Sequence, residues 1–252
     1  MRGLNGKAGL VAGGARGIGA ATARRLAEEG AMVAIGDIRF ELAQETAASI
    51  VAAGGRAIAV ELDGTKPDSA AAAVAATLAA FDRLDFVHSN LAGGTEGDHD
   101  ALDCPLDVFD KSVAVNLRSH LILTQAALPA MLKRGGGAMV YTSSGAATGG
   151  NPFQPAYAMT KNGVHALARH VATRYGRQGV RSNVIAPGLI LTEAVKQHLT
   201  EADVEKGRKR TPHTRFGEPK DIAALVAFLV SDDGEFINGQ VLYVNGGLQL
   251  RD

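Results

Sequence analysis

The sequence predicts an α/β fold of a single domain, in which a doubly wound parallel sheet is flanked by helices on both faces. Three observations lead to this prediction. Short apolar runs alternate with helical patterns along the chain, and no linker or repeat interrupts them. A glycine-rich turn joins the first apolar run to the first helical pattern. The length of 252 residues, with 46% hydrophobic residues, suits one large domain with a substantial core.

Seven apolar runs are expected to form the strands of this sheet. Each is a short run of the kind found in strands that are buried in parallel sheets. The expected strands cover residues 7–12, 32–37, 56–61, 86–89, 138–142, 181–185 and 241–244. Helices are expected over residues 18–29 and over the alanine-rich segment 69–81, whose high helix propensity favours a helix that covers the sheet over low-complexity disorder.

The first turn carries glycines with the spacing Gly13-x-x-x-Gly17-x-Gly19. Gly13 permits a tight turn, Gly17 lets the backbone approach a pyrophosphate, and Gly19 lets the helix pack closely against the strand. The N-terminus of the following helix also offers unpaired N–H groups to phosphate oxygens. A glycine triad alone is a weak signal, but this one lies between a strand and a helix. It therefore favours a dinucleotide ligand.

A carboxylate at the end of the second expected strand supports the same ligand. Asp37 follows the glycine turn by roughly 20 residues, where an acidic side chain would accept hydrogen bonds from the hydroxyls of an adenosine ribose. It would also repel a 2′-phosphate, which favours NAD over NADP. Arg16 and Arg39 are near enough in sequence to soften this preference. The alternative is an ordinary loop carboxylate at the end of a strand.

Tyr157 and Lys161 stand four residues apart and would share one face of a helix, thirteen residues after Ser144. A phenol has a pKa near ~10 and is a poor base at neutral pH unless a nearby cation favours the phenolate. Lys161 would be that cation, so the pair is interpreted as a device for proton transfer. The structural alternative is a half-buried tyrosine stacked on a lysine stem.

Further motifs follow in order along the chain. They are Leu62-Asp63, Asn90-Leu-Ala-Gly93, Asn116, Ser143-Ser144, the run from Asn183 to Pro187-Gly188 with Thr192, Asn238-Gly-Gln240, and Asn245-Gly-Gly247. Together with the glycine turn and Tyr157-x-x-x-Lys161, their order and spacing make the chain resemble the short-chain dehydrogenase/reductase family. The resemblance runs over about residues 4–247.

The resemblance implies a role for each catalytic candidate. Tyr157 would be the general acid/base that exchanges a proton with the substrate oxygen, and Ser144 would hydrogen-bond that oxygen. Lys161 would bind the nicotinamide ribose and lower the pKa of the tyrosine. Asn116 would hold a water that connects Lys161 to solvent. These types suit hydride transfer, which develops an alkoxide that needs a donor and a proton path.

The resemblance also implies the residues that contact the ligands. Those expected to contact NAD are Gly13, Ala15, Arg16, Gly17, Ile18, Gly19, Asp37, Ile38, Asp63, Gly64, Asn90, Ala92, Gly93, Tyr157, Lys161, Pro187, Gly188, Ile190 and Thr192. Those expected to face the substrate are Ser144, Gly94, Phe153, Gln154 and Tyr157. The chain departs from the family pattern at Ala12, Leu91 and Asn245, where threonine, asparagine and aspartate are common. We expect these changes to reduce local rigidity and not to remove activity.

Three functions fit these motifs. The first is an oxidoreductase that uses NAD(H) on a secondary alcohol or ketone, and the second is a reductase of 3-oxoacyl thioesters on coenzyme A or an acyl carrier protein, with NADPH tolerated. The third is a catalytically silent dinucleotide-binding protein, which the intact catalytic set disfavours. Segment 193–218 resembles a substrate lid of the family. Its basic residues from Lys206 to Arg210 would suit an anionic substrate or, as we prefer, a solvated helix face.

The amino-acid composition limits the kinds of partner that the protein is expected to bind. Lysine plus arginine and aspartate plus glutamate each number 26, so the formal net charge is zero and gives no footprint for nucleic acid or anionic membranes. Without an apolar run of membrane length or a signal-peptide pattern, we expect a cytoplasmic protein. Cys104 is expected to pack in a loop, and His165 and His170 to lie at the surface or at a subunit contact. No metal site is expected. A homo-oligomer, a tetramer or dimer, follows from the resemblance.

Overall fold

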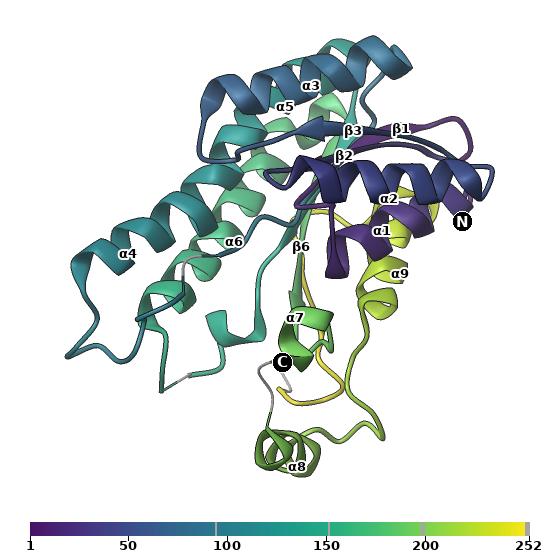
Figure 1. Ribbon diagram of the computed structural model, residues 1–252. Coiled ribbons are helices and arrows are strands. Elements are labelled where there is room, and N and C mark those ends of the chain that lie inside the picture. The colour runs from purple at the N-terminus through teal and green to yellow at the C-terminus, as the bar shows by residue number, and fades with distance from the viewer. Residues whose placement is uncertain (94, 151, 198–199, 250–252) are drawn as a thin grey trace.

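Seven parallel strands form one sheet in the order β3-β2-β1-β4-β5-β6-β7 (Figure 1). The structure is a computed structural model that describes residues 1–93, 95–150, 152–197 and 200–249. The strands are β1 (Ala8–Ala12), β2 (Met32–Asp37), β3 (Arg56–Glu61), β4 (Phe86–Ser89), β5 (Gly137–Thr142), β6 (Val180–Pro187) and β7 (Val241–Val244). The predicted doubly wound sheet is confirmed, because the chain builds outward from β1 to β3 and then outward through β4 to β7.

Most strand boundaries match the sequence prediction, and β6 is the main exception. It begins one residue earlier than expected and continues to Pro187. The extension arises because β7 pairs with the last part of β6, where Ala186 lies opposite Tyr243 and Pro187 opposite Val244. A proline is tolerated there because Gly188, and not Pro187, supplies the N–H that pairs with the Val244 carbonyl of β7, at 3.0 Å.

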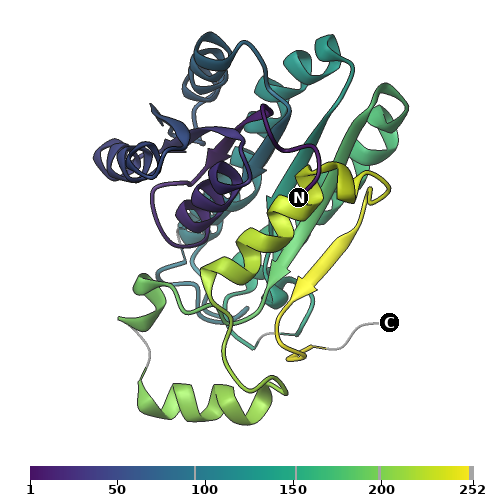
Figure 2. The same ribbon diagram turned by 90° about the vertical axis from the view of Figure 1, so that its right-hand side faces the viewer.

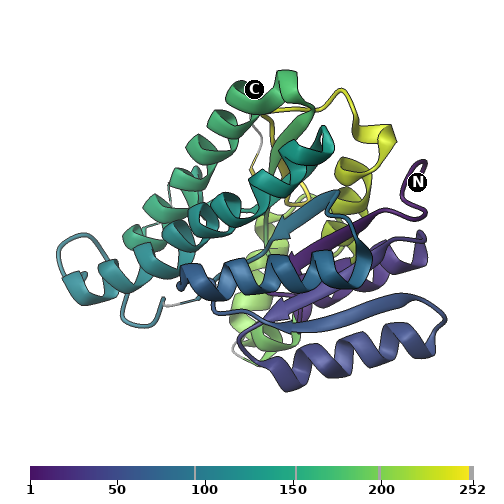
Figure 3. The same cartoon turned by 90° about the horizontal axis from the view of Figure 1, so that it is seen from above.

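Helices cover both faces of the sheet (Figures 2 and 3). Helices α1 (Gly17–Glu28), α2 (Phe40–Ala52) and α9 (Pro219–Val230) pack their apolar residues into one core, with α1 beside α9. Helices α3 (Pro67–Phe81), α5 (Ser119–Arg134) and α6 (Pro155–Tyr175) pack into the other. The alanine-rich segment is thus a helix that covers the sheet, as predicted. Small alanine side chains allow it to lie close to the strands.

The remaining short elements lie around the ends of the strands. Helix α4 (Leu106–Val113) leads through a π-helical turn, Ala114–Arg118, into α5. Helices α7 (Glu193–Lys196) and α8 (Glu201–Arg210) follow β6, and α8 stands apart from the body of the molecule (Figures 1 and 2). Among the described residues, no helix combines the length and the apolarity that crossing a membrane requires.

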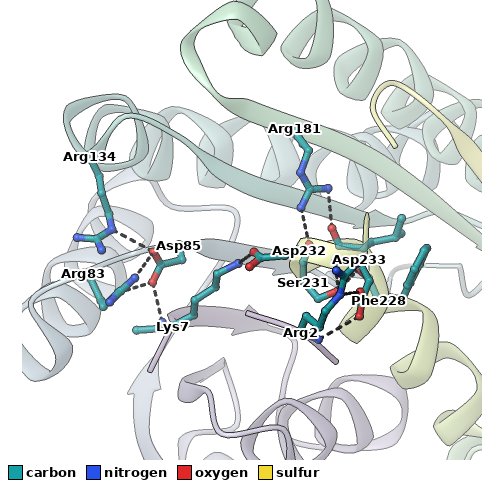
Figure 4. A network of polar contacts seen from close by, with 12 residues as sticks. Arg2, Lys7, Arg83, Asp85, Arg134, Arg181, Phe228, Ser231, Asp232 and Asp233 are labelled. Carbon is teal, nitrogen blue, oxygen red and sulfur yellow. Dashed lines mark hydrogen bonds and ion pairs between the residues drawn. The ribbon is translucent and has the colours of Figure 1, made fainter. Parts of the chain in front are cut away.

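A network of polar contacts links residues at the amino ends of the strands (Figure 4). Asp85, just before β4, accepts a hydrogen bond from the Ala8 N–H at 2.8 Å. It is also paired with Arg83 at 2.6 Å and Arg134 at 3.0 Å. Burial acts to raise the pKa of Asp85, but the hydrogen bonds from Arg83, Ala8 and Arg134 together hold that pKa below its usual value.

Replacing Asp85 with asparagine should lower the free energy of unfolding by about 1–3 kcal/mol at neutral pH, since charge-assisted hydrogen bonds are lost. The folded pKa lies below the unfolded value, so the stabilisation is present above that unfolded value and is lost as pH falls through the folded pKa. Denaturant unfolding at neutral and acidic pH measures this, with the exposed Glu45→Gln as control. An equal loss of unfolding free energy at both pH values, or the same loss in the control, would contradict this prediction.

Candidate active site

A cavity of about 990 Å³ opens at the carboxyl ends of the strands. This is the place where open α/β sheets bind ligands. The predicted site residues that line it are Gly13, Arg16, Gly17, Ile18, Asp37, Ile38, Asp63, Gly64, Asn90, Ala92, Ser144, Tyr157, Lys161, Pro187, Gly188, Ile190 and Thr192. Residues from separate parts of the sequence therefore meet around one space.

The glycine turn leaves its backbone free for a phosphate group. Gly13 and Gly17 have φ values of 74° and 55°, which L side chains rarely adopt. A Cβ on Gly19 would lie 2.0 Å from the Gly13 carbonyl oxygen, so close packing of α1 requires glycine there. The helix begins after Arg16 without a side-chain cap. Its first N–H groups can thus face a pyrophosphate, which is the fit expected for a dinucleotide.

Asp37 lies at the end of β2 with only 4% of its surface exposed. One carboxylate oxygen accepts the Ala15 N–H at 3.1 Å, and the other accepts the Arg39 N–H at 3.0 Å and lies 3.3 Å from Arg39 Nε. Asp37 therefore ties the glycine turn to β2 as well as lining the cavity. Each carboxylate oxygen can accept more than one hydrogen bond, so a ribose hydroxyl can still be held.

The adenosine side of the cavity is ordered by local hydrogen bonds. Asp63 accepts hydrogen bonds from the backbone and the hydroxyl of Thr65 at 3.0 and 2.6 Å. The pKa of Asp63 lies below its usual value. The largest cause is the side-chain hydrogen bond from Thr65, and burial opposes it. Asn90 Nδ2 donates to the Gly13 carbonyl at 3.2 Å and so joins β4 to the glycine turn.

The catalytic candidates converge from three elements. Tyr157 lies in the first turn of α6, and Ser144 follows the end of β5 and acts on the pKa of the Tyr157 phenol. Lys161, one turn further along α6, is 1% exposed, and its Nζ lies 5.9 Å from the centre of the Tyr157 ring. That amine donates to the carbonyl oxygens of Leu91 at 3.1 Å and Thr142 at 3.0 Å.

Burial changes both pKa values in this pair. It raises the pKa of Tyr157, and the Ser144 side chain opposes that change. It lowers the pKa of Lys161 to about 7. The expected lowering of the tyrosine pKa by Lys161 is therefore not found in this structure. The physical reason is that desolvation disfavours both charged forms and that the amine is directed to two carbonyl groups.

Asn116 lies in the π-helical turn and does not line the cavity. Its Nδ2 donates to the Gly93 carbonyl at 2.7 Å and to Ser112 Oγ at 3.1 Å, and its Oδ1 accepts the Gly93 N–H at 3.1 Å. The side chain thus holds the loop after β4. Turns of π-helix inside α-helices are frequent at functional sites because they reorient side chains and backbone groups.

The expected substrate residues are brought together only in part. Ser144 and Tyr157 line the cavity, whereas Phe153 and Gln154 do not. Phe153 is 63% exposed, and Gln154 has a left-handed backbone with φ of 61°. Gly94 lies outside the described residues. Ala15, Gly19 and Gly93, predicted to contact the cofactor, do not line the cavity.

Comparison with known proteins agrees with this geometry. A family model described as enoyl-(acyl carrier protein) reductase matches residues 13–249. The chain is 40% identical to an L-rhamnose 1-dehydrogenase (NAD(P)(+)) of Sphingomonas sp. (strain SKA58), over 99% of each chain. It is 35% identical to a 7alpha-hydroxysteroid dehydrogenase of Bacteroides fragilis, over 96% of this chain and 94% of the relative. The chain belongs to the short-chain dehydrogenase/reductase family.

A solved structure of the same family has nearly the same fold. It is a 7 alpha-hydroxysteroid dehydrogenase complexed with NADH and 7-oxo glycochenodeoxycholic acid. The two share a TM-score of 0.93 and 33% sequence identity over 98% of this chain and 97% of that one. The dinucleotide fit derived above from the glycine turn is in keeping with this likeness.

The three departures from the family pattern have identifiable contacts in this short-chain dehydrogenase/reductase. At Ala12, the backbone carbonyl accepts the Asn90 N–H at 2.9 Å, so β1 and β4 remain joined. Leu91 packs against Gly64, where a Cβ would lie 2.5 Å from its side chain, and its carbonyl holds Lys161. Asn245 donates to the Gln249 carbonyl at 3.0 Å and orders the turn after β7.

The prediction that His165 lies at the surface is wrong. His165 is 3% exposed, and its Nε2 lies 2.7 Å from Ser143 Oγ, which in turn donates to the Lys161 carbonyl. It is buried because it stands four residues after Lys161 on the inward face of α6. Burial lowers its pKa to about 4, so the imidazole is neutral. His170 is exposed, as expected.

Proposed function

We propose that this short-chain dehydrogenase/reductase is an oxidoreductase that transfers a hydride between NAD(H) and a secondary alcohol or ketone. One observation carries the proposal: Ser144, Tyr157 and Lys161 line the same cavity as the glycine turn, and the Ser144 hydroxyl acts on the pKa of the Tyr157 phenol. A binding module would not need a proton donor beside Lys161 in that cavity. The family membership and the NADH complex of the similar structure support the same activity.

The side chains of this site divide the work of the reaction. When bound, the nicotinamide supplies or accepts the hydride. Tyr157 donates its phenolic proton to the oxygen of a ketone as that oxygen becomes an alkoxide, and takes a proton back in alcohol oxidation. Ser144 hydrogen-bonds the same oxygen and stabilises its developing charge. Lys161 would bind the cofactor ribose, and Asn116 would hold a water that connects Lys161 to solvent.

A panel of secondary alcohols and ketones tests this proposal. It should contain aldoses, hydroxysteroids and cyclic diketones, because relatives are named L-rhamnose 1-dehydrogenase, 7alpha-hydroxysteroid dehydrogenase and levodione reductase. Turnover is followed by the absorbance of the reduced nicotinamide. Absence of turnover with every class, in both directions and with both cofactors, would refute the proposal.

A preference for NAD over NADP is proposed from Asp37. We expect a lower KM for NAD⁺ than for NADP⁺, and Asp37→Ala should raise the NADP-to-NAD ratio of kcat/KM by about 100-fold, a difference of roughly 2.7 kcal/mol. The reason is that the substitution removes the charge that repels a 2′-phosphate and leaves Arg16 and Arg39 beside it. Glu61→Ala is the matched control, because Glu61 lies opposite Asp37 on β3 without lining the cavity. Equal cofactor preference in the wild type, or an equal shift in the control, would contradict this.

A reductase of 3-oxoacyl thioesters is the second candidate, and the basic end of α8 is the observation that favours it. Arg208, Lys209 and Arg210 form the last turn of that helix. Cations there also stabilise the helix C-terminus, and Lys209 lies 3.4 Å from Glu205. Because no residue of α8 lines the cavity, we favour the first function. Adding 3-oxoacyl thioesters to the panel separates the two.

We further propose that segment 193–218 acts as a lid over the substrate and that the protein is a cytoplasmic homo-oligomer. Glu193 to Lys196 line the cavity mouth, which supports the lid. Leu121 on α5 and Met159 on α6 are 44% and 55% exposed, which supports a contact between copies on those helices.

A further inference from the structure

The proposed proton donor lies at the least secure part of its helix. Tyr157 is the third residue of α6, which begins at Pro155. The first N–H groups of a helix have no partner within it, so the first turn frays unless a side chain caps it. Gln154, at the N-cap position, has a left-handed backbone and makes no side-chain cap. Something else must hold this turn if Tyr157 is to keep its place.

Asp98 supplies the missing cap from a distant part of the chain. One of its carboxylate oxygens accepts the Tyr157 N–H at 2.9 Å, and the other accepts the Ala156 N–H at 3.3 Å. These are the N–H groups that an N-cap side chain normally satisfies, but Asp98 precedes them by 58 and 59 residues. The residue is 4% exposed. Its negative charge lies at the positive end of the helix dipole.

The loop that carries Asp98 contacts α6 and the Asn116 turn at separate points. Gly93, near its start, exchanges two hydrogen bonds with Asn116. The His99 carbonyl, next to Asp98, accepts the Gln154 N–H at 2.8 Å. Cys104 Sγ lies 3.5 Å from the Asp98 oxygen that accepts the Ala156 N–H. These contacts hold the Asp98 carboxylate in place, whereas a carboxylate on a surface side chain would be free to move.

We propose that Asp98 is a positioning residue that fixes the first turn of α6 and thereby the phenol of Tyr157 against Ser144. The inference rests on the proposed function. Asp98 would act through the backbone of Tyr157 and not by contact with substrate or cofactor, since it does not line the cavity. Small displacements of a catalytic group reduce the rate strongly because proton transfer needs a hydrogen-bond distance.

Two variants test the inference in the intact enzyme. Asp98→Ala removes both acceptors and should lower kcat by about 100-fold, with the KM for NAD⁺ nearly unchanged. Asp98→Asn keeps one acceptor and the shape, so its kcat should lie between those of the two other forms, about tenfold below that of the wild type. Asp85→Asn is the matched control, because it also removes a partly buried carboxylate that holds a backbone N–H, but at the amino ends of the strands. It should keep the wild-type kcat.

Amide hydrogen exchange gives a readout that does not need turnover. Exchange at Ala156 and Tyr157 should become faster in Asp98→Ala and stay slow in Asp85→Asn. Unchanged kcat in both Asp98 variants at a temperature where they are folded would overturn the inference, as would an equal loss of kcat in Asp85→Asn. If Asp98→Ala does not fold, a kcat of Asp98→Asn equal to that of the wild type overturns it. A wild type without turnover would refute the proposed function, and the exchange rates would still show whether Asp98 caps α6.

Discussion

Replacing Tyr157 with phenylalanine is expected to lower kcat by about 10³-fold and to leave the KM for NAD⁺ nearly unchanged. The substitution deletes the phenolic hydroxyl, which faces the same cavity as Ser144, and keeps the ring that lies beside Lys161. Burial raises the pKa of this phenol, so it carries its proton at neutral pH and is ready to donate it to a ketone oxygen. Without it, only water or Ser144 could supply that proton.

The experiment separates chemistry from binding. Initial rates give kcat, and the fluorescence of bound NADH gives the cofactor affinity. Tyr175→Phe is the matched control, since Tyr175 lies at the other end of α6, where its ring contacts His170 and Arg174. It should retain full activity. A Tyr157→Phe enzyme that turns over at more than about a tenth of the wild-type rate would contradict the assignment of the general acid.

The fold could be predicted from the sequence because its signals are local. Each central strand is a short apolar run, and the glycine turn sits directly between β1 and α1. Boundaries were predicted less well where another strand decides them. Pro187 belongs to β6 only because Val244 pairs with it from a segment 57 residues later, and no property of residues 181–187 alone indicates that.

The site was predictable where residues are close in sequence and unpredictable where distant parts meet. The four-residue spacing placed Lys161 beside Tyr157, and the same rule should have placed His165 on the inward face. Asp98 gave no signal, because its partners lie 58 and 59 residues away. The pKa values of Tyr157 and Lys161 also depend on burial, which the spacing does not reveal.

Replacing Lys161 with methionine is expected to lower kcat about as much as Tyr157→Phe does. Unlike Tyr157→Phe, it should also raise the KM for NAD⁺. The KM should rise by about tenfold or more, since a charge-assisted hydrogen bond contributes roughly 1.5–3 kcal/mol. The physical reason is that the amine would bind the nicotinamide ribose as well as serve the proton path. A KM for NAD⁺ equal to that of the wild type would contradict the ribose contact while leaving Tyr157 unaffected.

The same substitution should change how stability depends on pH. Burial lowers the folded pKa of Lys161 to about 7, against 10.5 for the free side chain. Between these values the unfolded chain binds a proton that the folded chain does not, so wild-type stability gains from rising pH by up to about 1.4 kcal/mol per unit. Below pH 7 both states bind the proton and this contribution has no slope. Methionine removes the contribution altogether.

Denaturant unfolding at several pH values from 7 to 9 measures this contribution. The free energy of unfolding of Lys161→Met, relative to that of the wild type, should be highest at pH 7 and should fall as pH rises. The carbonyl groups of Leu91 and Thr142 lose their donor in the variant, which costs about 1–3 kcal/mol each at every pH, so the slope is the decisive quantity. Lys133→Met, an exposed position on α5, should run parallel to the wild type. If Lys161→Met also runs parallel, burial does not lower the pKa of this amine into the range from 7 to 9.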